Sequence, residues 1–188
     1  ATALHIMQIG DSLTVGDMIP RGWRQLFQDW HGSGGRGVLA LGKPFAGAIT
    51  WGVTAAQSGR WSANSIFGSG WTEGGPALGI SGFTQTARSP GAAVSLAADN
   101  AENRFDIVSL CGVTGPNAGS VQVHFGTTPP PPIVQPVVSL DPSLPPPAPS
   151  GPPPLVLDFA ADVAGARCQS FASPQRTDKV TFTTLADK

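Results

Sequence analysis

Two hydrophobic patterns follow one another near the start of the chain. Residues 4–9 (Leu-His-Ile-Met-Gln-Ile) form a short apolar run, which is typical of a buried parallel strand and which ends at Gly10. Within 19–30, apolar side chains recur at helical spacing, and Gly32 suits a helix end. The order strand, tight turn, helix predicts the beginning of an α/β unit, with 38–41 as a second strand.

The pattern changes to period two in the second half of the chain. Apolar and polar residues alternate in 94–96, 105–110 and 120–125, and turn residues separate these runs. Residues 155–159 and 179–184 look like two more strands. This pattern predicts antiparallel strands in a sandwich-like arrangement. Prolines cluster in residues 129–154, which predicts an irregular, exposed linker or long loop.

Composition limits the classes of function. Charged residues make up 12% of the 188 residues and the formal net charge is −1, which argues against a nucleic-acid binder. No apolar run approaches the roughly 20 residues that a membrane-spanning helix needs. Three scattered histidines and two cysteines lack metal-ligand spacing, so we predict no metal site and no cofactor.

Cys111 and Cys168 are open to two interpretations. In a secreted protein they would form a disulfide that closes a long loop, and otherwise they would be two buried free thiols. The chain starts Ala1-Thr2-Ala3, as it would after removal of a signal peptide, although an artificial chain boundary would look the same. We predict a secreted or periplasmic protein.

The strongest chemical signal is the stretch 9–16, Ile-Gly-Asp-Ser-Leu-Thr-Val-Gly. A nucleophilic serine is well placed on a tight turn between a buried strand and a helix, where backbone N–H groups can stabilise an oxyanion. Gly10 permits such a turn, Asp11 can bond local N–H groups, and Ser12 would face the crevice at the sheet edge. The simpler interpretation is an ordinary turn with Ser12 as a helix cap.

The motif Gly10-Asp11-Ser12-Leu13-Thr14 resembles block I of the SGNH (GDSL-type) hydrolase superfamily. The resemblance covers roughly residues 1–60. It implies a flavodoxin-like α/β/α fold and the hydrolysis of acyl esters. It also implies that Ser12 is the nucleophile and that the Ser12 backbone N–H is one donor of the oxyanion hole.

The family supplies two further oxyanion donors, a glycine and an asparagine in later sequence blocks. Gly52, within 49–54, is the candidate glycine, and Asn117, in the Gly-Pro-Asn of 115–117, is the candidate asparagine. Each has a simpler interpretation. Gly52 fits a plain turn glycine, and Asn117 fits a hairpin turn before the next strand.

The general base of the family has no counterpart in this sequence. That base is a histidine two or three residues after an aspartate near the C-terminus, whereas no histidine follows His124. Asp29 and His31 have the right spacing but lie on the predicted first helix. Because a serine hydroxyl without a base is a weak nucleophile, we expect a second polypeptide segment to carry the Asp/His pair. It would be a downstream part of the same gene product or a partner chain.

Some SGNH hydrolases carry a β-sandwich insert after block I. The resemblance therefore implies the N-terminal part of an SGNH-type α/β domain in 1–75 and a β-rich region or insert in 76–188. On this interpretation the chain is the first part of a larger enzyme.

We predict a carboxylic ester hydrolase that acts on O-acyl esters, chiefly acetyl esters, of a carbohydrate. Trp51, Trp61 and Trp71 lie in loops rich in Gly and Ser and could stack on sugar rings, although core packing or loop anchoring explains them as well. Arg21 and Arg24 are expected on the solvated face of the helix. The alternative function is a non-catalytic carbohydrate-binding or surface module on the same scaffold.

Overall fold

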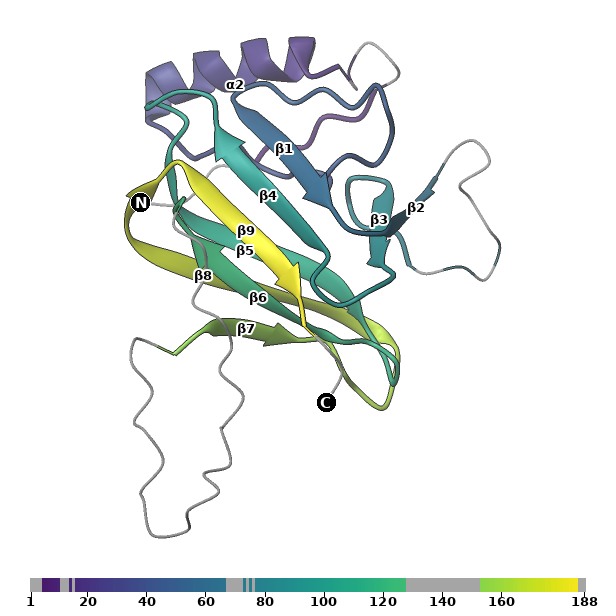
Figure 1. Ribbon diagram of the computed structural model, residues 1–188. Helices are drawn as coiled ribbons and strands as arrows, with labels where there is room; N and C mark the ends of the chain where they lie inside the picture. Colours follow the sequence, from purple (N-terminus) through teal and green to yellow (C-terminus); the bar gives the residue numbers. More distant parts are fainter. Residues whose placement is uncertain are drawn as a thin grey trace, which may run out of the picture.

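The fold is built mainly from antiparallel β-structure. The computed structural model describes residues 5–10, 14, 16–66, 73, 75, 77–127 and 153–185. Within them the chain forms nine strands and one full helix, and every ladder between named strands is antiparallel (Figure 1). The predicted flavodoxin-like α/β fold, which needs a parallel sheet between helices, is therefore wrong.

Five strands form the main sheet, in the spatial order β1-β4-β9-β6-β7. Their bounds are Val53–Ser58 for β1, Ala93–Ala98 for β4, Lys179–Thr184 for β9, Ser120–Phe125 for β6 and Leu155–Asp158 for β7. The sheet contains strands from both predicted regions, 1–75 and 76–188. Strand β1 belongs to the first region and pairs along its whole length with β4 of the second. The predicted strands at β4, β6, β7 and β9 are confirmed.

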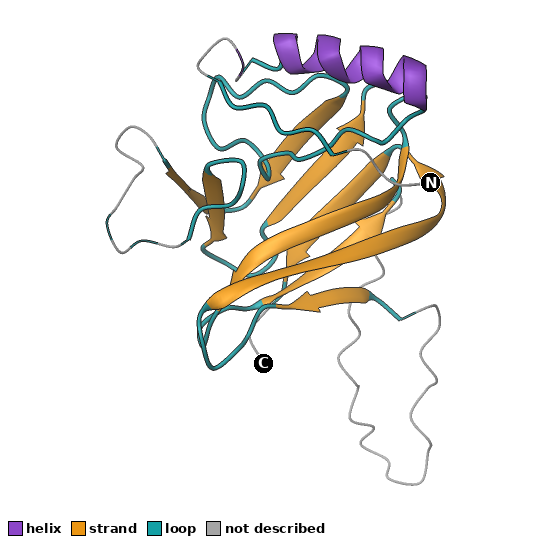
Figure 2. Ribbon diagram, turned by 180° about the vertical axis from the view of Figure 1, so that it is seen from behind, coloured by secondary structure: helices purple, strands orange, loops and turns teal. Residues whose placement is uncertain are grey.

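A two-stranded ribbon packs on one face of this sheet and closes the core. It pairs β5 (Phe105–Thr114) with β8 (Gly165–Thr177). The core that the two layers share consists of Leu110, Val123, Leu157, Phe159, Phe171, Val180 and Phe182. A separate pair, β2 (Trp61–Ser65) with β3 (Phe83–Ala87), lies beside the main sheet (Figure 2).

Helix α2 (Met18–His31) confirms the helical pattern of the sequence. It ends at Gly32, which has a φ of 90° and donates its N–H to the Gln28 carbonyl, as expected for a glycine that stops a helix. Both ribbon views place α2 across the end of the sheet at which β1 begins and β4 ends (Figures 1 and 2). None of its residues is buried.

The two strands predicted in the first 41 residues are absent. Residues 5–10 are exposed and have no regular secondary structure, and Val38 and its neighbours up to Leu41 form no strand either. An apolar run becomes a parallel strand only where neighbouring strands form hydrogen bonds with its backbone N–H and C=O groups. Here the described strands pair antiparallel with one another, so these apolar runs have no sheet to join. Leu41 instead packs against the core as a loop residue.

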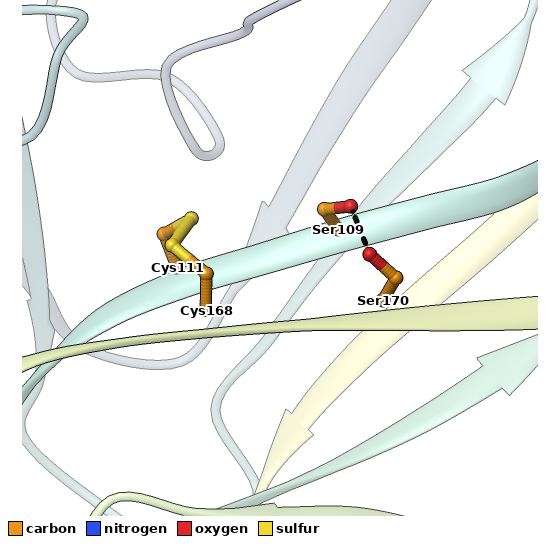
Figure 3. Close-up of a disulfide and its surroundings, with 4 residues drawn as sticks. All are labelled: Ser109, Cys111, Cys168 and Ser170. Carbon is orange, nitrogen blue, oxygen red and sulfur yellow. Dashed lines mark hydrogen bonds between the residues drawn. A yellow bond between two sulfur atoms is a disulfide. The ribbon is translucent and has the colours of Figure 1, made fainter.

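The two cysteines form a disulfide, which settles the alternative left open by the sequence. Cys111 on β5 and Cys168 on β8 lie directly opposite each other in the ladder, and both are exposed. The hydroxyls of Ser109 and Ser170, the next pair on the same face, are 2.7 Å apart (Figure 3). The disulfide therefore fastens the outer face of the ribbon that covers the core.

Replacing Gly112 by alanine is expected to lower the free energy of unfolding by about 1–3 kcal/mol, because it overpacks the core. A Cβ at Gly112 would lie 2.5 Å from a ring carbon of the buried Phe159. Gly115→Ala is the matched control, since nothing lies within 4 Å of a Cβ there. Urea unfolding of the two variants measures the difference, and equal midpoints would contradict this packing.

Candidate functional site

Gly10 and Thr14, which flank the predicted nucleophile in the sequence, lie close to each other. Asp11 and Ser12 lie outside the described residues, whereas Gly10 and Thr14 on either side of them are described. A Cβ at Gly10 would overlap the Thr14 side chain, so only glycine fits there without a shift. The Thr14 carbonyl then accepts the backbone N–H of Asp17 at 3.0 Å. The proposed role of Gly10 in a turn at Ser12 stays a prediction, because that turn lies outside the described residues.

Asp17, just before α2, is the centre of a network of charged groups. Its φ is 59°, in the left-handed region that few residues other than glycine adopt, and it is 7% exposed. Its carboxylate accepts hydrogen bonds from both guanidinium nitrogens of Arg24, at 3.1 and 3.3 Å, and from Arg36. It also accepts the backbone N–H of Trp51 at 3.3 Å. The prediction that Arg24 lies on a solvated face is wrong, because the fold turns it toward Asp17.

Arg36 forms a second connection between Asp17 and the loop before β1, in addition to the direct hydrogen bond between Asp17 and Trp51. Its Nε donates to the Trp51 carbonyl at 2.8 Å, and another nitrogen of its guanidinium donates to the Asp17 carboxylate. Burial and then the neighbouring Arg24 charge lower the pKa of the Arg36 guanidinium, against the opposing effect of Asp17. The backbone of Trp51 is thus held on both sides, by Asp17 at its N–H and by Arg36 at its carbonyl.

Gly52 directly follows this clamped residue. Its φ of 86° favours glycine, and a Cβ there would lie 2.9 Å from the Asn103 amide nitrogen. The Gly52 carbonyl accepts the backbone N–H of Asp99 at 3.1 Å. Gly52 is therefore a turn glycine, and the fold brings its turn to Asp17, five positions beyond Ser12 in the sequence.

Asn117 lies at the far end of the main sheet. It is an exposed residue of the turn between β5 and β6, where the Gly115 carbonyl accepts the Ala118 N–H at 3.1 Å. Strand pairing aligns Val53 with Ala98 at one end of the sheet and Val121 with Thr184 at the other. The six residues of β9 span about 16 Å between these ends, so the fold does not bring Asn117 and Gly52 together.

The fold places His31 and His124 away from the Gly52 turn. His5 is exposed in the irregular stretch 5–10, and His31 is the last residue of α2, about 20 Å from the helix start. His124 is on β6, three strand spacings or about 14 Å from β1, and its Nε2 is buried without a hydrogen-bond partner. These placements agree with the expectation that the general base is supplied by another segment.

The tryptophans of the sequence analysis have different environments. Trp51 is 42% exposed, and the Arg21 guanidinium carbon lies 4.7 Å from the centroid of its ring. Trp61 donates its Nε1–H to the Ser58 carbonyl at 2.8 Å, which favours the loop-anchoring interpretation for that residue. Trp71 lies outside the described residues. Only Trp51 therefore combines an open ring with a place near the predicted site.

A hollow with a volume of about 230 Å³ lies on the face of the main sheet. Its described lining is small or polar and comes from β1, β4 and β9: Ala56, Gln57, Ser58, Ala93, Ser95, Lys179 and Thr181. No aromatic ring is among these residues, so the hollow offers no stacking surface to a sugar.

The sequence analysis missed Asp17 and Arg36. Their connection depends on the fold, since Arg36 and Trp51 are 19 and 34 positions from Asp17. One signal was available, because Asp17 and Arg24 are seven positions apart, which puts them on one side of a helix.

Comparison with known proteins gives no significant match to a family model, a curated protein or a solved structure. No helix within the described ranges is long and apolar enough to cross a membrane. In the same ranges, no three side chains of His, Cys, Asp or Glu are grouped so that they could hold a metal ion.

Replacing Asp17 by asparagine is expected to lower the free energy of unfolding by about 2 kcal/mol. Asparagine tolerates the left-handed conformation, so the change removes the charge that Arg24 and Arg36 share while it keeps the backbone. Asp29→Asn is the control, because Asp29 is exposed and bonds only Gln25 among the described residues. Thermal unfolding compares the two, and a similar loss in both would show that the network does not stabilise this region.

Proposed function

We propose that this protein is a serine ester hydrolase that removes O-acyl groups, chiefly acetyl groups, from a carbohydrate, with Ser12 as nucleophile. The observation that carries the proposal is the Asp17 network. It joins the residues that follow the Gly-Asp-Ser-Leu-Thr motif to the turn of Gly52, the candidate oxyanion glycine. A serine hydrolase needs such a connection, because the nucleophile and the oxyanion donors must be held in one fixed arrangement.

The proposed reaction has two steps. The Ser12 Oγ attacks the ester carbonyl carbon, its proton passes to a general base, and the tetrahedral oxyanion accepts the backbone N–H groups of Ser12 and Gly52. Collapse breaks the bond between the carbonyl carbon and the sugar oxygen, which takes the proton from the base and leaves as a hydroxyl, and Ser12 is left acylated. Water then attacks this ester with the help of the same base and releases the carboxylic acid and free Ser12. Asn117 has no part in this proposal, because it lies at the opposite end of the sheet.

The general base is proposed to come from a second polypeptide segment with an Asp/His pair. The placement of His31 and His124 supports this, and so does the exposed apolar surface along α2 and the stretch before it. On α2, Trp23 is 56% and Trp30 72% exposed, and the preceding stretch 5–9 is exposed as well. Exposed apolar surface of this extent on consecutive elements is typical of a docking surface. We assign the segment that carries the base as its occupant.

The disulfide fits the proposed secreted or periplasmic location, because such bonds persist in oxidising compartments. The alternative of a non-catalytic carbohydrate-binding module has no comparable support, since the hollow on the main sheet lacks an aromatic platform.

Covalent labelling with a fluorophosphonate tests the proposed nucleophile. Such a probe phosphonylates an activated serine and displaces fluoride, so peptide mapping of the native polypeptide is expected to find the added mass on Ser12. The heat-denatured protein is the control and should stay unlabelled. Labelling that is absent, or that is spread over other serines, would refute the assignment of Ser12.

A further inference from the structure

Arg21 and Trp51 form an exposed pair beside the turn of Gly52. The Arg21 guanidinium lies over the Trp51 ring, 4.7 Å from its centroid, and no described carboxylate forms an ion pair with it. The backbone of Trp51 is fixed by Asp17 and Arg36, and its ring contacts the Arg21 guanidinium. A planar guanidinium stacked on an aromatic ring keeps the N–H donors along its edge available for a bidentate acceptor.

The charge around this pair is positive. Arg24 and Arg36 both pair with the carboxylate of Asp17, whereas Arg21 pairs with no described carboxylate. With Asp99, on the other side of the Gly52 turn, also counted, the formal balance of these five groups is still +1. Asp99, whose N–H binds the Gly52 carbonyl on the other side of the turn, already accepts the Thr54 hydroxyl at 2.7 Å. An anionic group that approaches Trp51 therefore meets unbalanced positive charge and at least one unpaired guanidinium.

We propose that the substrate is an acylated polysaccharide with carboxylate groups, and that Arg21 and Trp51 recognise one of its uronic acid residues. The Arg21 fork would bind the sugar carboxylate through two parallel hydrogen bonds, and the exposed part of the Trp51 ring would contact the sugar ring. Gly52 follows Trp51 in the chain, so this residue would lie next to the ester that is cleaved. The inference rests on the proposed function, because it specifies the substrate of that site.

Binding to the Ser12→Ala variant of the full chain tests the proposal without any need for hydrolysis. The ligands are a tetramer of galacturonic acid and its methyl-esterified form, which has the same sugars without the charge. Calorimetric titration at low salt is expected to give about tenfold tighter binding of the charged tetramer, a preference that added salt reduces. Equal affinity for the two tetramers, or no binding of either, would overturn the proposal.

Two arginine variants locate the effect. Arg21→Gln is expected to remove the tenfold preference, whereas Arg60→Gln, the same change beyond the opposite end of β1, is expected to keep it. An equal loss in both variants would show a general effect of net charge and would overturn the assignment to Arg21. The result is independent of catalysis: binding without Ser12-dependent hydrolysis would refute the hydrolase, and hydrolysis without charge preference would refute this inference alone.

Discussion

Replacing Ser12 by alanine is expected to reduce ester hydrolysis by the complete enzyme about a thousandfold or more. The change removes the only atom that can form the acyl-enzyme, and loss of the nucleophile in serine hydrolases has effects of this order or larger. The change from serine to alanine removes a single oxygen atom and adds no volume, so the fold should tolerate it. The measurement is the rate of acetate release from an acetylated oligosaccharide.

Ser33→Ala is a suitable control, because Ser33 lies in the glycine-rich loop after α2 and has no proposed role. Its rate should match that of the unchanged protein. Thermal unfolding of both variants shows whether each is folded. A folded Ser12→Ala variant that keeps more than a tenth of the original rate would exclude Ser12 as the nucleophile.

Breaking the disulfide is expected to have the largest effect on stability. The bond joins residues 57 positions apart, and closure of a loop of that length restricts the unfolded chain by about 4 kcal/mol at 25 °C. This is a large part of the roughly 5–15 kcal/mol by which domains are stable. The bond also fastens β5 to β8, the two strands whose Leu110 and Phe171 cover the core. Urea unfolding of the Cys111→Ser/Cys168→Ser variant measures the loss.

The neighbouring pair Ser109 and Ser170 provides the control on the same face of the ribbon. Replacing both by alanine removes one exposed hydrogen bond and should cost about 1 kcal/mol or less. Reductant should lower the unfolding midpoint of the unchanged protein and leave that of the cysteine-free variant where it is. Coincident midpoints for the oxidised and reduced protein would contradict the stabilising role of the bond.

The sequence predicted the elements in which apolar residues recur at a regular helical or strand spacing. The apolar spacing in 19–30 and the stop at Gly32 identified α2, and strict alternation identified β4 and β6. In the strands the local pattern and the tertiary environment agree, because they place apolar side chains toward the core, whereas α2 follows its helical pattern with no residue buried.

Elements that depend on distant partners could not be predicted in this way. Strand β8 is exposed at nearly every position and has no alternation, so its extended form depends on pairing with β5. Residues 4–9 differ in the opposite way. Their pattern is strongly strand-like, but residues 5–9 pair with no strand among the described residues. A hydrophobic pattern states what a segment can bury, whereas the partner that buries it is set by the rest of the fold.

The candidate site was predictable only in part. The local motif singled out Ser12 and Gly10 as candidates, and Gly52 was a candidate because the resembled family supplies a glycine in a later sequence block. Strand register, which no local pattern gives, separates Gly52 from Asn117. The network of Asp17 and Arg36 joins residues far apart in the sequence, and such contacts become visible only in three dimensions.

The central claim is that Ser12 hydrolyses esters with a base from a second segment, and one assay tests it most directly. Acetate release is measured for the 188-residue chain alone and for the native material from which it comes, each with and without Ser12→Ala. The account predicts rapid, Ser12-dependent release by the native material and at most a trace from the isolated chain. Full Ser12-dependent turnover by the isolated chain would contradict the second segment, and no Ser12-dependent release from either would contradict the hydrolase.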